Sequence, residues 1–201
     1  PRDYFDYVIV DEFHHAAADT YKRIIRYFKP KFLLGLTATP DRLDDKNIYE
    51  ICDFNVVYDV RLKEAVNKGW LVPFRYYGIY DCTVNYDNIS YVHGKYDEEE
   101  LEKELMIPQR GDLVYHNYSK YNCKRALAFC STKKHAEYMA ELFQNRGVKA
   151  AAVYSGTDGE YNLDRREALE ELKDGRLQII FSVDMFNEGL DVKNIDMVLF
   201  L

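Results

Sequence analysis

Short apolar runs that end in acidic, hydroxyl or small residues recur along the chain, and stretches of helical periodicity separate them. The first run, residues 7–10, is rich in β-branched side chains and predicts a buried strand. Apolar residues at i, i+3, i+4 and i+7 then predict a helix over residues 17–28, which Pro30 ends. A second apolar run over residues 32–36 predicts another strand. A strand, a helix and a strand of these lengths form a right-handed parallel crossover.

The alternation continues through the rest of the chain. It predicts a short helix near residues 47–52, a strand near 55–60, a helix over 62–69 and a strand over 74–80. Further along, it predicts strands at 125–129, 149–154, 177–181 and 196–201, with one helix that ends at Gly147 and another over 163–173. Strands that alternate with helices indicate an α/β fold with mostly parallel sheets covered by helices.

The pattern changes over residues 82–120. An acidic run over residues 97–105 predicts a helix with a narrow apolar stripe, and a second helix is expected over 111–121. Acidic runs usually form solvated faces, which is the interpretation preferred here. We therefore divide the chain into a first lobe over residues 1–81, an inter-lobe connection over 82–120 and a second lobe over 121–201.

Composition sets the class of protein. The 201 residues, 47% of them hydrophobic, can bury one large or two small cores. The net charge of −7 argues against a protein that coats nucleic acid, but it leaves room for a narrow basic groove. No apolar run approaches the roughly 18 residues of a membrane span, and no signal peptide is visible. The first and last residues predict a fragment of a longer protein. The absence of a long apolar run predicts that the protein does not contact a membrane.

The four cysteines are Cys52, Cys82, Cys123 and Cys130. They form no C-x-x-C pair, so a structural zinc site has little support. We interpret them as reduced, partly buried thiols of a cytoplasmic protein.

The first two strands end in groups that can do chemistry. Asp11 and Glu12 follow the first strand, and in parallel α/β sheets the reacting groups lie beyond the carboxyl ends of strands. In P-loop nucleotide hydrolases, such acids hold magnesium and polarise the attacking water. Thr37 and Thr39 follow the second strand and could relay hydrogen bonds to the acids. The alternatives are a solvated loop for the acids and turn chemistry before Pro40 for the threonines.

Four strings in the chain carry a family signature. Residues 11–14 (DEFH) resemble motif II of the superfamily-two helicases, and residues 36–40 (LTATP) resemble motif III. Residues 128–132 (AFCST) resemble motif IV, and residues 182–192 (SVDMFNEGLDV) resemble motif V. Each string alone is weak, but four in the same order are specific. The resemblance covers nearly the whole chain, is weakest over 82–120, and is greatest toward motors related to type III restriction subunits.

The resemblance implies an α/β fold of two RecA-like lobes, each incomplete in this stretch, with ATP and Mg²⁺ in the cleft between them. By resemblance, Asp11 would bind Mg²⁺, Glu12 would be the general base, and His14 with Thr37 or Thr39 would couple the nucleotide site to the nucleic-acid site. Two residues of the second lobe, Gly189 and Asp191, would face the nucleotide. Four residues would contact the nucleic-acid backbone, which small hydroxyls and backbone amides can position without reading bases: Ser131, Ser155, Gly156 and Ser182. His15 is interpreted as a surface or supporting histidine.

Two elements of such a motor are absent from the sequence. No G-x-x-x-x-G-K-[ST] loop occurs in the 201 residues, and the string at residues 93–96 (HGKY) lacks the first glycine and the hydroxyl residue. The arginine of the family's last motif would lie after Leu201. We therefore expect the 201 residues alone to hydrolyse ATP poorly, whereas the full protein does so.

The sequence leaves three candidate functions. The preferred one is an ATP-dependent helicase or translocase that acts on nucleic acid, with DNA favoured over RNA and with a nuclease or modification subunit or domain as partner. The alternative is a non-catalytic, helicase-like scaffold. A small-molecule kinase is disfavoured by the string at residues 188–191 (EGLD) in the second lobe.

Overall fold

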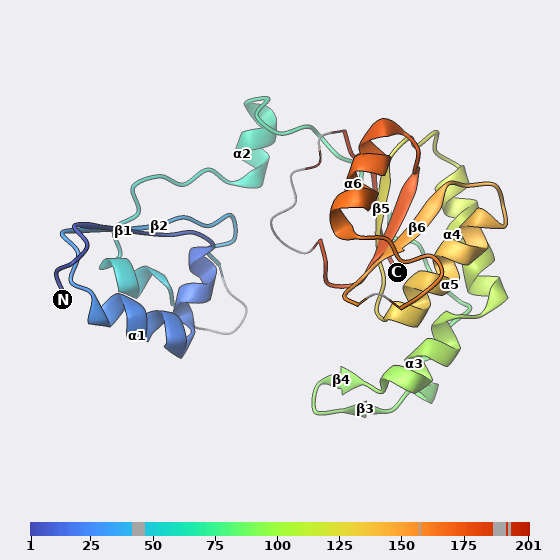
Figure 1. The fold of residues 1–201 in the computed structure, drawn as a ribbon, viewed down its shortest axis with the longest axis horizontal. Coiled ribbons are helices and arrows are strands. Elements are labelled where there is room, and N and C mark those ends of the chain that lie inside the picture. Colours follow the sequence, from blue (N-terminus) through green and yellow to red (C-terminus); the bar gives the residue numbers. More distant parts are fainter. Residues whose placement is uncertain (42–46, 157, 187–191, 193) are drawn as a thin grey trace. The chain divides into compact units, whose positions relative to one another are not determined.

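The computed structural model describes residues 1–41, 47–156, 158–186, 192 and 194–201. These residues form two compact units, a first unit of residues 1–76 and a second unit of residues 77–201, which are described separately below (Figure 1). Residues 82–120, interpreted from sequence as a connection, are grouped with the second unit. Among the described residues, no helix combines the length and the apolar character needed to cross a membrane.

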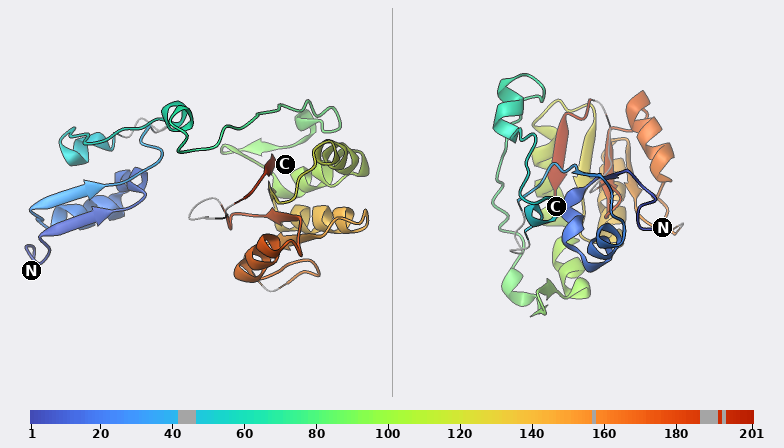
Figure 2. Two further views of the ribbon diagram at one scale, coloured as in Figure 1. Left: turned by 90° about the horizontal axis from the view of Figure 1, so that it is seen from above. Right: turned by 90° about the vertical axis from the view of Figure 1, so that its left-hand side faces the viewer.

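The first unit is built on one parallel strand pair. Strand β1 (Tyr7–Val10) pairs with β2 (Phe32–Gly35) in register, and the backbone N–H of Leu36 extends the ladder by donating to the Val10 carbonyl at 2.9 Å. Helix α1 (Asp19–Tyr27) confirms the helix predicted over residues 17–28, and it connects the two strands together with the 3₁₀-helix η1 (Phe13–Ala17), which was not predicted. Helix α1 lies along one face of the pair (Figures 1 and 2), over a small core of Phe13, Ala16, Ala17 and Ile48.

After β2, the structure agrees with the predicted helices but not with the predicted strands. The 3₁₀-helix η2 (Tyr49–Cys52) and helix α2 (Leu62–Asn67) lie where short helices were expected. The strands predicted near residues 55–60 and 74–80 are wrong, because these segments form no strand in the structure. Val57 is 85% exposed and Tyr76 is 81% exposed. Apolar and aromatic content favours a strand only where the backbone meets a neighbouring strand, and these segments pair with none of the described residues.

The second unit is built on a four-stranded parallel sheet with the order β6–β7–β5–β8. The strands are β5 (Ala126–Phe129), β6 (Ala150–Val153), β7 (Ile179–Ser182) and β8 (Met197–Phe200). Helix α5 (Lys133–Gln144) follows β5, and helix α6 (Arg165–Asp174) follows β6. These elements confirm the alternation predicted from the sequence.

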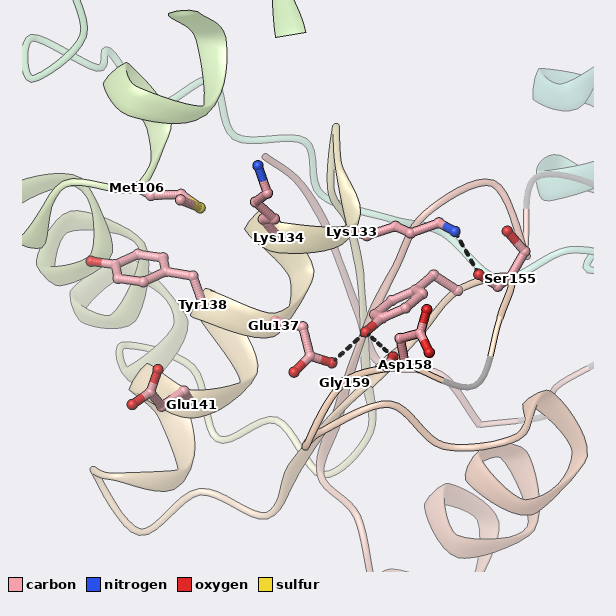
Figure 3. A pocket seen from close by; sticks show the side chains of 10 residues that line it. Met106, Lys133, Lys134, Glu137, Tyr138, Glu141, Ser155, Asp158 and Gly159 are labelled. Atoms are coloured by element: carbon pink, nitrogen blue, oxygen red, sulfur yellow. Dashed lines mark hydrogen bonds between the residues drawn. The ribbon is translucent and has the colours of Figure 1, made fainter. Parts of the chain in front are cut away.

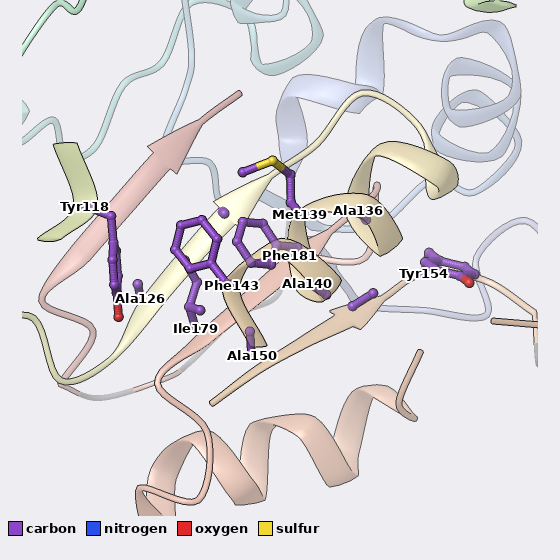
Figure 4. Packing of buried hydrophobic residues seen from close by; sticks show 12 residues of the cluster. Tyr118, Ala126, Ala136, Met139, Ala140, Phe143, Ala150, Tyr154, Ile179 and Phe181 are labelled. Atoms are coloured by element: carbon purple, nitrogen blue, oxygen red, sulfur yellow. The ribbon is translucent and has the colours of Figure 1, made fainter. Parts of the chain in front are cut away.

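Side chains of this sheet alternate between two cores. Ala126, Ala128, Ile179 and Phe181 point toward α5 and α4 (Pro108–Ser119), whereas Leu127 and Ile180 point toward α6. Figure 4 shows the first of these cores, in which Phe143 of α5 packs with Phe181 at 5.0 Å between ring centroids. Alanines on the strands let α5 approach the sheet closely, and Phe143 and Met139 fill the remaining volume.

Two helices and a hairpin precede this sheet. Helix α3 (Glu98–Leu105) and helix α4 confirm the two helices expected in residues 82–120. After the 3₁₀-helix η3 (Tyr86–Asn88), strands β3 (Tyr91–Val92) and β4 (Lys95–Tyr96) form a hairpin that the sequence interpretation missed. His93 and Gly94 both have positive φ, 54° and 82°, as a two-residue hairpin turn requires. The Gly94–Lys95 pair, which resembles part of a phosphate-binding loop in sequence, therefore belongs to this hairpin.

Candidate functional site

The acidic pair lies directly after β1, at the carboxyl end of the strand. Asp11 is exposed, and its Oδ1 accepts a hydrogen bond from the backbone N–H of Glu12 at 2.9 Å. Glu12 has left-handed backbone angles, φ 48° and ψ 50°. Such a conformation costs a non-glycine residue of order 1–3 kcal/mol and is concentrated at functional sites. The chain therefore turns sharply at Glu12, so that two consecutive carboxylates lie at one sheet edge.

His14 connects the two strand ends. Its Nδ1 lies 3.3 Å from Glu12 Oε2 and 3.1 Å from Thr37 Oγ1, and its side chain is only 17% exposed. Thr37 Oγ1 also accepts the backbone N–H of Thr39 at 3.1 Å. The structure thus brings Glu12, His14, Thr37 and Thr39 together, with hydrogen bonds that join Thr37 to both His14 and Thr39.

Phe13 anchors the backbone that carries Glu12 and His14. It lies between Glu12 and His14 in the sequence, is 4% exposed, and its N–H donates to the Leu36 carbonyl at 2.8 Å. Its ring occupies the space next to Gly35: a Cβ at position 35 would lie 2.4 Å from the ring. Gly35 therefore allows the ring to pack against β2, which in turn fixes the backbone that carries Glu12 and His14.

The carboxylates after β1 fit a divalent cation that is shared with phosphate groups. Magnesium is commonly held by one or two carboxylates together with substrate phosphates and water. The exposed carboxylate of Asp11 meets this requirement. Among the described residues, no group of three or more His, Cys, Asp and Glu side chains converges into an all-protein metal cage. A magnesium ion at Asp11 would accordingly depend on phosphate oxygens and water for its remaining ligands.

Three of the predicted backbone-contact residues lie on loops of the second unit. Ser131 and Ser155 are exposed after β5 and β6, and Gly156 has φ +111°, which suits glycine. The Nζ of Lys133, at the start of α5, donates to the Ser155 carbonyl at 2.7 Å (Figure 3). The Ser155 loop and α5 border an open pocket of about 470 Å³. Lys133 was not singled out from the sequence, since lysines are common on solvated helix faces.

Ser182 does not fit the predicted contact with nucleic acid. Its side chain is fully buried within β7, and its hydroxyl donates to the Ala128 carbonyl at 3.4 Å. A buried hydroxyl that bonds its own sheet offers no surface to a phosphate, so we remove Ser182 from the contact set. The two residues predicted to face the nucleotide, Gly189 and Asp191, lie outside the described residues.

A buried polar relay, composed of Asp81, Arg110, His135 and Ser131, leads to the end of β5. Arg110 Nε donates to Asp81 Oδ2 at 3.0 Å, and Arg110 Nη1 lies 3.2 Å from His135 Nε2. His135 Nδ1 lies 3.2 Å from Ser131 Oγ. Arg110 and His135 are 6% and 0% exposed. This Asp81–Ser131 relay was missed from the sequence, although His135 precedes Met139 by four residues and therefore lies on the buried face of α5.

The environment shifts the pKa values of the relay. Burial, assisted by the charge of Arg110, lowers the pKa of His135 to about 4. Burial alone would raise the pKa of the Asp81 carboxyl, but hydrogen bonds from Thr83 and the charge of Arg110 outweigh it and hold that pKa below its usual range. At neutral pH the relay therefore consists of a carboxylate, a guanidinium, a neutral imidazole and a hydroxyl.

Two family models match parts of the chain, one in each unit. The family described as "Type III restriction enzyme, res subunit" matches residues 1–42, and the "Helicase conserved C-terminal domain" matches residues 109–201. The chain is similar to a 51.5 kDa protein of a Lactococcus phage, with 25% identity over 92% of this chain and 40% of the phage protein. It is also similar to the DNA 3'-5' translocase XPB2 of Sulfurisphaera tokodaii, with 24% identity over 94% of this chain and 50% of that protein. The chain thus spans half or less of the length of these relatives.

Solved structures support the same architecture. The chain resembles Saccharomyces cerevisiae Dbp5 in a complex with Gle1 and IP6, with a TM-score of 0.52 and 13% identity over 98% of this chain and 43% of that one. At this identity the likeness concerns the fold alone. Together with the parallel sheet of the second unit, it confirms the predicted α/β class with RecA-like lobes.

Proposed function

Because this chain belongs to the superfamily-two helicases related to type III restriction subunits, we propose that it is part of a motor that couples ATP hydrolysis to movement on nucleic acid. The observation that carries the proposal is the contact of His14 with both Glu12 and Thr37, at 3.3 and 3.1 Å. This contact ties the end of β1, where the acids lie, to the end of β2.

Glu12 is the general base in this proposal. Its carboxylate, 43% exposed, can accept a proton from a water that attacks the γ-phosphate, and His14 holds it from the protein side. Asp11, one residue earlier, would hold Mg²⁺, which supplies charge neutralisation on the phosphates when bound. Hydrogen bonds couple the position of His14 to Thr37 and Thr39 in the loop after β2. A displacement of Glu12 would therefore also move this second segment of the first unit.

The second unit supplies contacts to the nucleic-acid backbone. Ser131, Ser155 and Gly156 lie on exposed loops after β5 and β6, and Lys133 adds a cation beside Ser155. Hydroxyls, backbone amides and lysines recognise phosphates without reading bases, so the proposed track is DNA of any sequence. The match to the family of type III restriction-enzyme subunits supports a nuclease or modification subunit or domain as the partner. A cytoplasmic location is part of the same proposal.

The proposal is tested by ATP hydrolysis in the full-length protein, with duplex DNA, single-stranded DNA or RNA added. We expect stimulation by DNA. Glu12→Gln should lower the turnover rate by about 10²–10⁴-fold, because it removes a general base while keeping the shape of the side chain. Glu50→Gln, on an exposed residue of η2, is the matched control and should leave turnover unchanged.

The outcomes separate the motor from the non-catalytic scaffold. Stimulated hydrolysis that Glu12→Gln abolishes supports the motor. Absence of hydrolysis with every nucleic acid would contradict it and favour the non-catalytic scaffold. The 201 residues alone are proposed to turn over ATP poorly, because they contain no phosphate-binding G-x-x-x-x-G-K-[ST] loop; rapid hydrolysis by this stretch would contradict that part.

A further inference from the structure

The Asp81–Ser131 relay is buried at Arg110 and His135, and of its four members only Ser131 has a part in the proposed function. It runs from the segment before α3 through α4 and the first turn of α5 to the loop after β5. Burying an arginine and a histidine is costly unless each polar atom finds a partner. Here each ring nitrogen of His135 has one: Arg110 at Nε2 and Ser131 at Nδ1, both at 3.2 Å.

The partners fix where the His135 proton lies. Guanidinium groups only donate hydrogen bonds and stay charged, so the contact with Arg110 requires an unprotonated Nε2 that accepts. A neutral imidazole then carries its single proton on Nδ1. Asp81 holds the Arg110 guanidinium in this orientation through a 3.0 Å ion pair.

The tautomer in turn determines the role of Ser131. A protonated Nδ1 donates to Ser131 Oγ, so the serine accepts from the histidine and keeps its own proton for another acceptor. Ser131 is exposed, whereas His135 behind it is fully buried. The opposite tautomer would make Ser131 donate inward and would present only lone pairs to the solvent. Phosphate oxygens accept hydrogen bonds and do not donate them.

We propose that Arg110 and His135 are positioning residues that set Ser131 as a hydrogen-bond donor to a phosphate of the bound nucleic acid. This inference rests on the proposed function, because it assigns the ligand of one predicted contact residue. It goes further in stating which buried groups determine the direction of that hydrogen bond.

The first test needs no nucleic acid and no variant. In the full-length protein labelled with ¹⁵N-histidine, NMR should find His135 neutral at pH 7, with the proton on Nδ1. His135→Asn provides the assignment by removing one set of signals. A proton on Nε2, or a charged ring at pH 7, would overturn the proposal.

The second test uses binding of a fluorescent single-stranded and a duplex DNA oligonucleotide to the full-length protein. Ser131→Ala should weaken binding about tenfold, as expected for the loss of a hydrogen bond to a charged group. Two substitutions at position 135 form a matched pair. Asn places its amide N–H near the position of Nδ1 and should retain binding. Gln places its amide near Nε2, loses the donor to Ser131, and should weaken binding by about threefold to tenfold.

A double substitution separates positioning from general damage. In the Ser131→Ala background, His135→Gln should add no further loss of binding, because its effect acts through the Ser131 hydroxyl. Additive losses, or equal losses for Asn and Gln, would assign His135 a merely structural role. Wild-type binding that Ser131→Ala leaves unchanged would overturn this inference while the proposed motor stands. Lack of DNA binding by the wild type would overturn both.

Discussion

The two units use similar strand sequences in different environments. Strands β6 and β7 are buried along their whole length, since α5 covers one face of their sheet and α6 the other. Strand β1 alternates between exposed and half-buried positions, with Tyr7 72% and Ile9 64% exposed. Apolar patterning therefore specifies a strand, but the layers packed against it decide how much stability that strand contributes. The candidate catalytic acids, Asp11 and Glu12, lie on the first, less buried unit, and the Asp81–Ser131 relay lies on the second.

The largest expected change in stability concerns the aromatic core of the second unit. Phe143 is fully buried, with Tyr118 and Phe181 at ring distances of 5.1 and 5.0 Å. Phe143→Ala should lower the free energy of unfolding of this unit by about 3–5 kcal/mol, because it removes apolar contacts and leaves a cavity. Hydrogen exchange of peptides from α5 and β7 in the full-length protein measures the change.

The matched substitution in the first unit is Phe74→Ala. Phe74 is 67% exposed, so we expect a change within about 0.5 kcal/mol. Equal losses for Phe74→Ala and Phe143→Ala would mean that residues 70–80 are packed in solution, and the contrast between the units would fail.

The second prediction concerns the pH dependence of the second unit. The folded unit keeps His135 neutral, with a pKa lowered to about 4, whereas an unfolded histidine titrates near pH 6.5. The unfolded chain therefore binds the proton more tightly, so the stability is complete above pH 6.5 and falls as the pH drops toward 4. The loss amounts to at most about 3 kcal/mol. The carboxylates of Asp81 and Glu102, whose pKa values are also lowered, add to the loss only at lower pH.

Two substitutions check the assignment of this pH dependence. His135→Asn should flatten the stability profile between pH 6.5 and 4, measured by hydrogen exchange of peptides from α5. His116→Asn changes an exposed histidine of α4 and should leave the slope as in the wild type. A slope that survives His135→Asn would point to other groups.

A third prediction links packing to chemistry in the first unit. Gly35→Ala places a Cβ 2.4 Å from the Phe13 ring and should cost about 1–3 kcal/mol through overpacking. Because Phe13 separates Glu12 from His14, displacement of the ring should also lower ATP turnover by about tenfold to a hundredfold. Gly78→Ala is the control, since a Cβ there meets no atom within 4 Å. Loss of stability with unchanged turnover would separate the acidic pair from Phe13.

The sequence predicted the elements better than their surroundings. Local periodicity was sufficient for α5 and β6, whose apolar faces are continuous, and the acids at the end of β1 were visible from residue type and position alone. The strand near 74–80 failed, because pairing depends on a neighbour that the local sequence does not specify. The predicted contact of Ser182 with nucleic acid was not supported for a related reason. The sequence is the same whether the hydroxyl of a serine at a strand end faces solvent or the sheet. The relay through His135 joins residues 54 positions apart, from Asp81 to His135, and only the fold brings them together.

The smallest expected effects come from two ion pairs of similar length. Glu64 and Lys68 lie 2.6 Å apart on α2, and Glu102 and Lys134 lie 2.8 Å apart between α3 and α5. The Glu64 side chain is 47% exposed and that of Glu102 is 12% exposed. Glu64→Gln should change stability by less than about 0.5 kcal/mol, because water and salt screen an exposed pair. Glu102→Gln should cost somewhat more, up to about 1 kcal/mol, because the Glu102 carboxylate is shielded from water although its partner Lys134 is 71% exposed. Hydrogen exchange of peptides from α2 and α3, at low and high salt, measures both. Equal effects would show that the distance between the charges, and not the burial of the carboxylate, governs the strength of these ion pairs.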